Sequence, residues 1–423
     1  MNQSAVEHSL DVLVVGAGMV GAAAAALLAR SGFSVAVVEN GEPAPFDPSQ
    51  PVGLRVSAFS PGSVNVLNEA GAWRQLQRQR HCPYRRMVVE DRDDSTVLTF
   101  DAPEFGLERL GTIIENDLVQ WSLWQSLLAA GGLELFCPDR VAKLDYDTGD
   151  PVVRLQSGTG IRCRLLVGAD GANSQIRELQ GIGQSHWEYG QQGLVGVVHT
   201  SEPNPGVAWQ RFMDGGPLAF LPLQDGSSSI VWSRPEAEAL RLLDMDEASF
   251  LSELESAVSG SEGHWPANVT HCGPRALFPL TMRLSERYAG RRAVLVGDAA
   301  HVVHPLAGQG VNLGLLDVAG LVQVLIDARS EGEDFASDKV LLKYDRWRRS
   351  EAEILARGIH GIRGLFIPEE LGFLRRIGID LVSRSWTARE AFIRRATGRN
   401  GNAPALSRGT TLTDMLQDKR RVT

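Results

Sequence analysis

The chain of 423 residues contains few cysteines and no surplus of positive charge, and these deficits exclude several classes of protein. Its four cysteines lie far apart without a CxxC pair, so the sequence predicts neither a zinc site nor a disulfide framework, and we expect reduced, mostly buried thiols. The formal net charge of -9 argues against nucleic-acid binding, because neutralising phosphates requires a basic surface. The cysteines are Cys82, Cys137, Cys163 and Cys272.

Long apolar runs are scarce as well. We expect no run that approaches the ~20 apolar residues needed to cross a bilayer. Residues 1–10 are polar and lack the apolar core of a signal peptide, so we expect a cytoplasmic protein. A chain of 423 residues exceeds the size at which a single core stops growing, so we expect two domains or one elaborated α/β domain.

The most informative stretch is residues 11–39, which reads as a strand, a turn, a helix and a second strand. A β-branched run at 12–15 leads into a GxGxxG turn, and Glu39 follows the second strand at 35–38. The first glycine permits a tight turn, the second leaves room for a pyrophosphate, and the third lets the helix lie close to the strand. The turn consists of Gly16, Ala17, Gly18, Met19, Val20 and Gly21. This stretch predicts a dinucleotide site, with FAD and NAD both open.

A second strand-turn-helix segment covers residues 164–177, and a single arginine stands out in an earlier loop. Asp170 suits a bond to a ribose or to backbone, and Arg177 suits a phosphate contact; alternatively, Asp170 caps the helix and Arg177 is its partner. Arg55 ends a loop rich in Pro and Gly. It either meets a phosphate or a flavin edge or is a solvated loop arginine, and both interpretations are open at this point.

The third segment begins with a strand at 293–296 that ends in Gly297-Asp298 and continues into a glycine-rich turn and a long helix. Asp298 suits a carboxylate that bonds a ribityl hydroxyl, and the turn offers backbone amides to a flavin ring. This segment favours FAD over NAD. His301 and His304 have no visible third ligand, so we predict no metal. No further GxGxxG follows a strand, so a pyridine nucleotide is expected to visit rather than occupy its own domain.

The segments between these motifs indicate a second, antiparallel unit. Residues 85–100 read as a hairpin outside the first sheet, and residues 193–233 contain strands separated by Gly-Gly and Asp-Gly turns. Residues 235–258 read as helical, with a buried side made of Leu240, Leu243, Phe250, Leu251 and Leu254. We predict FAD-binding segments at 1–80, 110–180 and 276–345, substrate-domain segments at 81–109 and 181–275, and C-terminal helices with a tail at 346–423.

Three separated motifs together resemble the flavoprotein aromatic hydroxylases: GAGMVG with Glu39, GADGANSQIR at 168–177, and GDAAH at 297–301 before HPLAGQGVNLGLLD. With GPLAFLPL at 216–223 and IIENDLVQWSLWQ at 113–125, the chain looks more narrowly like the ubiquinone-biosynthesis ring hydroxylases, from about residue 11 to residue 398. The resemblance implies an α/β fold with a Rossmann-like FAD-binding domain of the p-hydroxybenzoate hydroxylase type. It also implies an interleaved antiparallel β-sheet substrate domain and a C-terminal helical segment.

The resemblance further implies a resident FAD, NAD(P)H or another reductant as a transient electron donor, and O₂. Reduced flavin of this family forms a C4a-hydroperoxide that hydroxylates the ring of a polyprenylated phenol or quinol. Pro305, Gly308, Gln309 and Gly310 would surround the flavin ring, and no general base is assigned. The implied cofactor-binding residues are Gly16, Gly18, Met19, Val20, Gly21, Glu39, Arg55, Asn116, Gln120, Asp170, Arg177, Gly297, Asp298, Pro305, Gly308, Gly310, Val311 and Asn312.

Other functions on the same fold are a different aromatic hydroxylation, a halogenation or a polyprenyl reduction. The WxWxIP segment of flavin halogenases is not matched by Trp121-Ser122-Leu123-Trp124. A non-catalytic flavoprotein that serves as an assembly subunit is an alternative from another class. A homodimer or membership of a ubiquinone-biosynthesis complex is a further expectation.

Residues 371–399 interleave seven arginines with apolar side chains, against only Asp380 and Glu390. This pattern suits a helix lying on an anionic membrane surface, which would keep the protein peripheral to the inner face of the membrane. A helix packed on its own domain or on a partner is the alternative that we favour, because arginine stems also cover apolar protein surface.

Overall fold

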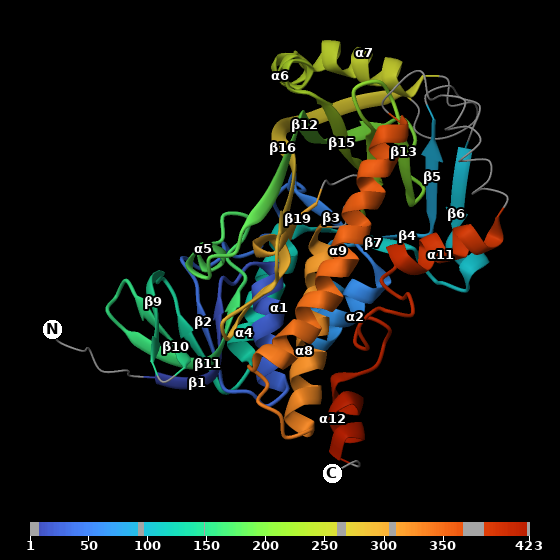
Figure 1. Ribbon diagram of the computed structural model, residues 1–423. Coiled ribbons are helices and arrows are strands. Elements are labelled where there is room, and N and C mark those ends of the chain that lie inside the picture. Colours follow the sequence, from blue (N-terminus) through green and yellow to red (C-terminus); the bar gives the residue numbers. More distant parts are fainter. Residues whose placement is uncertain are drawn as a thin grey trace.

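The computed structural model describes residues 8–91, 97–147, 149–259, 268–303, 310–366 and 385–420. Two large mixed layers dominate it: a mostly parallel sheet flanked by helices, and an antiparallel sheet covered by two helices on its outer side (Figure 1). The α/β fold class predicted from the sequence is confirmed.

The first sheet is built on β1 (His8–Val15), which lies between two parallel neighbours, β11 (Gly160–Gly168) and β2 (Val35–Val38). β8 (Leu133–Phe136) extends the parallel sheet beyond β2, and β18 (Ala293–Leu295) extends it beyond β11. All four residues of β2 are buried, which explains why its sequence is continuously apolar rather than alternating. Further pairing is antiparallel, through β9 (Val141–Asp147), β10 (Asp150–Leu155) and β17 (Ala289–Gly290).

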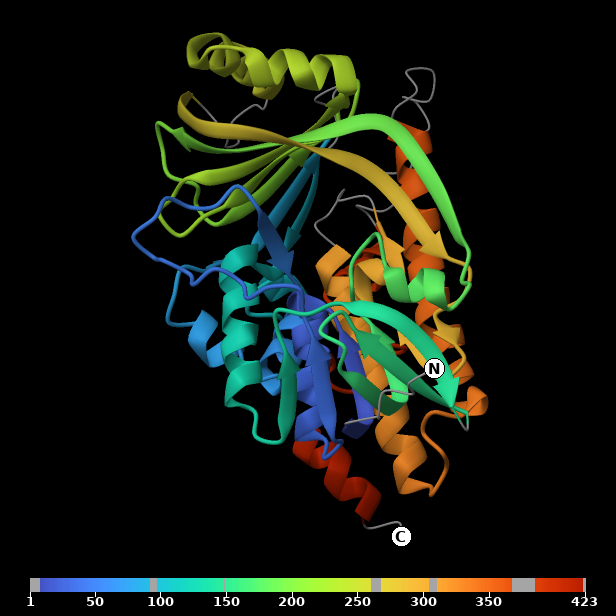
Figure 2. The same ribbon diagram turned by 90° about the vertical axis from the view of Figure 1, so that its left-hand side faces the viewer.

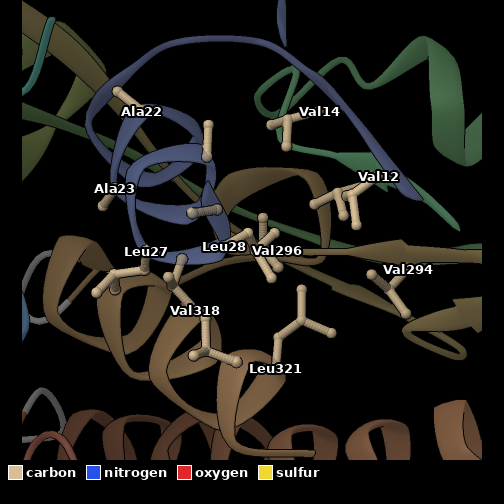
Figure 3. Packing of buried hydrophobic residues seen from close by; sticks show 14 of the residues in the cluster. Val12, Val14, Ala22, Ala23, Leu27, Leu28, Val294, Val296, Val318 and Leu321 are labelled. Atoms are coloured by element: carbon tan, nitrogen blue, oxygen red, sulfur yellow. The ribbon is translucent and has the colours of Figure 1, made fainter. Parts of the chain in front are cut away.

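Four long helices complete this unit: α1 (Met19–Arg30), α4 (Asn116–Ala129), α8 (Gly310–Ser330) and α9 (Asp338–Phe366). α1 packs on both α4 and α8, and α8 packs on α9. Figure 3 shows Leu27 and Leu28 of α1 gathered with Val318 and Leu321 of α8 and with Val294 and Val296 beside them. Helix α1, which follows the GxGxxG turn, therefore lies in the middle of the core.

The expectation that no run is apolar enough to cross a membrane was wrong for α8. By length and composition alone, Gly310–Ser330 passes as a candidate span, with a mean hydropathy of 1.6 in its most apolar window. In the structure, 78% of that window is buried inside the protein. α8 is apolar because α1, α2 and α9 all cover it.

A three-stranded sheet lies beside the first unit, in the order β3 (Val56–Phe59), β7 (Gly111–Glu115) and β4 (Cys82–Tyr84). Helix α2 (Pro61–Glu69) follows β3 and begins at Ser60, whose hydroxyl accepts the Ser63 amide. The short α3 (Trp73–Leu76) follows α2, and both pack on helices of the first unit. Arg55 directly precedes β3, so the position of this small sheet determines where Arg55 lies.

The second large sheet contains eight strands in the order β19-β16-β12-β15-β14-β13-β5-β6. β12 (Gln184–Thr200) and β16 (Val269–Ser285) are long strands that run from this sheet toward the first unit (Figure 2). The hairpin predicted at 85–100 is present one residue further along, at 86–101, and joins this sheet, with β5 paired to β13 in parallel. The remaining strands are β5 (Arg86–Glu90), β6 (Val97–Asp101), β13 (Val207–Arg211), β14 (Leu218–Pro222), β15 (Ser228–Pro235) and β19 (His301–Val302).

The predicted helical stretch 235–258 is two helices, α6 (Glu236–Asp244) and α7 (Glu247–Val258). The break occurs because Asp246 caps α7 by accepting the Ser249 amide. The break also resets the helical phase, so the predicted buried side was partly wrong. Leu240 is 48% exposed, and Leu242 takes the buried position in α6, while Phe250 and Leu254 are buried as expected.

The described part of the predicted Arg-rich segment contains α11 (Trp386–Ala396), which packs on its own chain. Phe392 stacks on Phe100 of β6 with ring centroids 5.3 Å apart, and Trp386 stacks on Phe105 at 5.2 Å. Arg389 pairs with Glu104 at 2.6 Å. Residues 371–384 lie outside the described residues, and the described part supports the packed interpretation. The other described helices are η1 (Ala102–Phe105), α5 (Gln175–Leu179), η2 (Gly297–Ala299) and α12 (Leu412–Arg420).

We predict that Leu27→Ala lowers the free energy of unfolding by about 2–5 kcal/mol, because Leu27 is fully buried in the first core and its truncation leaves a cavity. Guanidinium unfolding of the FAD-free protein measures this loss. Leu128→Ala is the matched control, since Leu128 is 54% exposed, and we expect it to change the free energy by less than about 0.5 kcal/mol. Equal losses in the two variants would contradict the proposed place of α1 in the core.

Candidate active site

The GxGxxG turn is shaped by contacts that leave no space for side chains at its outer glycines. A Cβ on Gly16 would collide with the Ala169 carbonyl, and one on Gly21 would collide with the Gly16 carbonyl. Gly16 also has a φ of 98°, which favours glycine. At Gly18, by contrast, a Cβ would meet nothing within 4 Å. The turn is therefore packed behind its outer glycines and open in front of its middle one, as a pyrophosphate site requires.

The N-terminus of α1 is left available for an anion. Gly18 caps the helix without a side-chain hydrogen bond, and the first turn holds no acidic residue. Its amides and the positive end of the helix dipole therefore remain available to a phosphate. Glu39 follows β2 and reaches this turn, where its carboxylate accepts the amides of Ala17 and Asn40. The structure thus brings the predicted ribose acceptor to the predicted phosphate turn, and these residues fit the ADP half of FAD.

Asp298 lies in η2 on the edge of the same sheet, after a chain reversal at Gly297, which has a φ of 60°. The Asp298 side chain is exposed, yet protein surrounds it closely enough to raise the pKa of its carboxyl, an effect that His301 and Arg55 oppose. A carboxylate that is accessible to solvent and also close to protein atoms suits hydrogen bonds from the hydroxyls of a ligand.

Arg55 acts on Asp298 from a segment far away in the sequence. Its guanidinium lies 5.2 Å from the centre of the Phe278 ring on β16, and its charge acts on Asp298. The Arg55 carbonyl accepts the Asn116 amide at 2.9 Å, which anchors the loop to the start of α4. The Arg55 side chain is exposed and lies against the Phe278 ring, so both interpretations of this arginine stay open. Its contact with a flavin stays a proposal.

Asp170 and Arg177 make contacts that stabilise the backbone of their own turn. Asp170 accepts the Ile176 amide at 3.0 Å and the Ser174 hydroxyl at 2.5 Å. Arg177 is 6% exposed and donates to the carbonyls of Ala172 at 3.1 Å and Ala299 at 3.3 Å. Asp170 thus supports the start of α5, as expected if it caps the helix. Arg177 does not pair with Asp170, and instead joins the turn to η2. These contacts tie two predicted cofactor segments together.

The remaining predicted residues are divided between structural contacts and undescribed chain. Asn312 near the start of α8 is 4% exposed; its amide donates to the Ala58 carbonyl at 2.7 Å, and its carbonyl accepts the Ser60 amide at 2.8 Å. Asn312 thereby joins α8 to β3. Asn116 accepts the Ser57 hydroxyl at 2.7 Å. Gln120, Met19 and Val311 are half-buried, Gly310 begins α8, and Pro305, Gly308 and Gln309 lie outside the described residues.

The face of the second sheet that looks toward Arg55 was not predicted residue by residue. Strand pairing aligns its side chains in a row across neighbouring strands, and alternate residues of these strands pack outward against Phe250 of α7. Ala276 lies in this row, and Phe278, two residues further along β16, shares its face. Alternation with period two would have identified the row from sequence. Its members are Val89, Gln210, Ala219, Val231, Val195 and Ala276.

Comparison with known proteins assigns the chain to a family. The model of the FAD binding domain family matches residues 9–358. The 3-demethoxyubiquinol 3-hydroxylase of Escherichia coli is 38% identical over 393 residues, covering 92% of this chain and 98% of that protein. The mitochondrial ubiquinone biosynthesis monooxygenase COQ6 of Xenopus tropicalis is 34% identical, covering 87% and 89%. The chain belongs to the FAD-dependent hydroxylase family of ubiquinone biosynthesis.

Solved structures agree at the level of the fold. PqsL, a probable FAD-dependent monooxygenase from Pseudomonas aeruginosa, has a TM-score of 0.71 at 23% identity, covering 88% of this chain and 100% of that chain. The p-nitrophenol 4-monooxygenase PnpA from Pseudomonas putida has a TM-score of 0.72 at 18% identity, covering 93% and 100%. Family membership makes this protein an FAD-dependent monooxygenase and confirms the choice of FAD as resident cofactor.

We predict that FAD binds this family member more tightly as pH rises through the raised pKa of Asp298, above the ordinary value of 3.8. The ionised carboxylate accepts hydroxyl donors better than the protonated one, so binding is linked to proton release. Asp298→Asn should flatten this dependence and weaken binding at neutral pH by about tenfold. Fluorescence titration of the FAD-free protein with FAD over a pH series measures both effects.

The stability of the FAD-free protein should show the opposite sign. The folded state holds the Asp298 proton more tightly than the unfolded state, so the free energy of unfolding attributable to this group falls as pH rises through the same window. Asp244→Asn, at an exposed carboxylate on α6, serves as the control and should leave both pH profiles unchanged. Identical FAD-binding profiles for wild type and Asp298→Asn would rule out a contact between Asp298 and the cofactor.

Proposed function

We propose that this protein hydroxylates the aromatic ring of a polyprenylated phenol or quinol in ubiquinone biosynthesis. The observation that carries the proposal is the match to a 3-demethoxyubiquinol 3-hydroxylase, which extends over 98% of that protein. In the reaction one ring C–H bond and O₂ give a ring hydroxyl and water. NAD(P)H and a proton supply the two electrons and both hydrogens of the water, and the ring hydroxyl keeps one hydrogen. FAD, when bound, supplies the redox and oxygen chemistry.

The chain's own contribution begins with holding the cofactor. The open front of the GxGxxG turn and the amides of α1 suit the pyrophosphate, and Glu39 suits the ribose. Asp298 would hold the ribityl hydroxyls, with Arg55 as the cation that acts on it. These groups come from four separate segments, so the site exists only in the folded chain. No general base is assigned.

The substrate ring is proposed to lie under the inner face of the second sheet. This row is apolar except for Gln210, the one polar side chain among its six members. An apolar roof excludes water from the site. The oxygen chemistry of a bound flavin needs this exclusion, because water leads to wasteful release of peroxide. The Gln210 amide is a hydrogen-bonding group for a ring oxygen of the quinol. Ala219, its neighbour across the strands, leaves space for the ring.

NAD(P)H is proposed to visit the protein briefly as the electron donor. Among the residues that the structure describes, the strand-GxGxxG-helix arrangement occurs at β1 and α1, where the ADP half of FAD would lie. The donor would therefore have no nucleotide domain of its own. Asp170 and Arg177, whose contacts hold their own turn in place, are proposed to border its passing site.

The direct test incubates the FAD-loaded protein with NADPH, O₂ and a short-chain prenylated demethoxyquinol. We expect a product heavier by one oxygen atom, with its ring position read by NMR, and oxygen consumption equal to product formed. A flavin that is reduced without hydroxylated product would overturn the proposal and favour a polyprenyl reductase or a non-catalytic assembly subunit.

We predict that Ala219→Phe lowers kcat/KM for this substrate by at least about tenfold, because the added ring occupies the space under the sheet. FAD content and affinity should stay unchanged. Ala237→Phe makes the same substitution at an exposed position of α6 and should retain wild-type kinetics. Product formation at an unchanged rate in Ala219→Phe would show that the ring does not lie under this row.

Peripheral membrane contact through residues 371–399 is proposed as the route by which an insoluble polyprenyl substrate is met. In the described part, Trp386 is 51% exposed and Phe392 is 45% exposed, although both stack on the substrate domain. Aromatic side chains of this kind favour the membrane-water interface. A homodimer or a place in a biosynthetic complex stays a prediction, and light scattering of the purified protein tests the dimer.

We predict that the protein cosediments with phosphatidylglycerol vesicles and that the double change Trp386→Ser and Phe392→Ser reduces the bound fraction by about tenfold, because buried apolar area is lost. Leu342→Ser on α9, where Leu342 is 43% exposed, is the matched control and should leave binding unchanged. Absence of wild-type protein from the vesicle pellet would contradict the membrane contact, while leaving the hydroxylase proposal intact.

A further inference from the structure

A cluster of charged side chains lies completely inside the FAD-binding unit, behind the Gly297–Asp298 turn. Asp317 of α8 is 0% exposed, while His301 of β19 and Arg348 of α9 are each 1% exposed. Groups of this kind are rarely buried unless they are paired, because removing charge from water is costly. From the sequence, His301 was considered only as a metal ligand, and no metal was predicted. No role was predicted for Asp317 or Arg348.

Asp317 is the centre of the cluster. Its Oδ1 accepts the Arg348 Nε at 2.9 Å, and its Oδ2 accepts the His301 Nε2 at 2.5 Å. Burial alone would raise the pKa of Asp317, but the neighbouring His301 and Arg348 hold that pKa below its ordinary value. Asp317 is therefore an anion in the folded protein, and the His301 Nε2 carries the hydrogen of their shared bond.

The same carboxylate reaches the cofactor turn. The Asp317 Oδ2 also accepts the amide of Gly297 at 3.2 Å. Gly297 is the residue at which the chain reverses, with a φ of 60°, and it directly precedes Asp298. His301 follows Asp298 by three residues, so Asp317 binds the segment on both sides of the proposed ribityl acceptor.

The backbone packing leaves this turn little freedom. A Cβ on Gly314 of α8 would lie 2.8 Å from a Val20 methyl carbon and 3.1 Å from the Gly297 Cα. On the opposite side of α8, a Cβ on Gly320 would lie 2.9 Å from the Arg348 Cδ. Small residues thus bring α8 close to the turn on one side and to Arg348 on the other. Through the charged cluster, the position of the turn depends on the positions of α8 and α9.

The arrangement is not optimised for stability alone. Within the described part of the chain, the His301 Nδ1, the Arg348 Nη2 and the Tyr288 hydroxyl are buried without a hydrogen-bond partner, and the Tyr288 and His301 rings are 5.7 Å apart. Each such group carries a desolvation cost. An apolar cluster of the same volume would avoid this cost but would offer no acceptor to the Gly297 amide.

We propose that His301, Asp317 and Arg348 form a positioning network that sets the Gly297–Asp298 turn in the geometry that FAD requires. Asp317 holds the turn through the Gly297 amide, and His301 and Arg348 hold Asp317. None of the three touches the reacting atoms. The proposal depends on FAD binding but not on the identity of the substrate, so it can fail or succeed independently of the proposed hydroxylation.

The test is a fluorescence titration of FAD into FAD-free variants, at a temperature at which each one is folded by circular dichroism. We expect His301→Leu to raise the Kd for FAD by about tenfold and to alter the visible circular dichroism of the bound flavin. His301→Gln retains an N–H donor for Asp317, and its Kd should stay within about threefold of wild type. A purely structural histidine would lower the unfolding midpoint without moving the Kd of the folded protein.

Two further variants keep the proposal testable if His301→Leu does not fold. Asp317→Glu retains the charge but displaces the carboxylate by one methylene group, and we expect about a tenfold higher Kd for FAD. Asp345→Asn is the matched control: Asp345 is a buried carboxylate of α9 that accepts the Tyr288 amide and has no contact with the turn. It should destabilise the protein while leaving the Kd unchanged. Wild-type Kd and flavin dichroism in folded His301→Leu or folded Asp317→Glu would overturn the proposal.

Discussion

The close approach of three backbones around the Val20 side chain is the constraint on which the rest of this structure depends. A Cβ added to Gly297 would lie only 3.1 Å from the methyl carbons of Val20. Gly314 of α8 faces the same Val20 side chain. Since α1, η2 and α8 meet here, the GxGxxG turn, the Gly297–Asp298 turn and the first turns of α8 lie close together. Any larger side chain at these glycines would push these elements apart.

The second sheet depends on this body for its function. β12 and β16 are each 17 residues long and reach from the antiparallel sheet down to the first unit, where β16 pairs with β19 beside the GDAAH segment. Helices α6 and α7 cover the outer face (Figures 1 and 2), and Phe278 on the inner face lies against Arg55. Alternation along each strand therefore sorts bulky core residues outward and the row from Val89 to Ala276 inward.

Several buried polar side chains connect segments of the candidate site. The Asp317 cluster lies behind the Gly297 turn, Arg177 connects that turn to the Asp170 loop, and Asn312 connects α8 to β3. These side chains replace backbone pairing between segments that share no strand ladder. Their cost in desolvation is accepted because an irregular turn needs hydrogen-bond partners from elsewhere in the fold.

The local motifs were readable from sequence because their physics is local. A GxGxxG turn between a strand and a helix, an acid after the next strand, and an aspartate-glycine turn each specify their own backbone within a few residues, and the family resemblance joined them to FAD. The hairpin predicted at 85–100 was equally accessible, since two short β-type strands joined by an acidic turn specify it. Long-range relations were different. The buried side of residues 235–258 shifted because one cap reset the helical phase. The apolar composition of α8 is explained only by its burial against α1, α2 and α9. The charge of Arg55 acts on Asp298, and Asp317 binds Gly297 and His301, only because strands and helices distant in sequence pack together. Burial then determines which charges must pair.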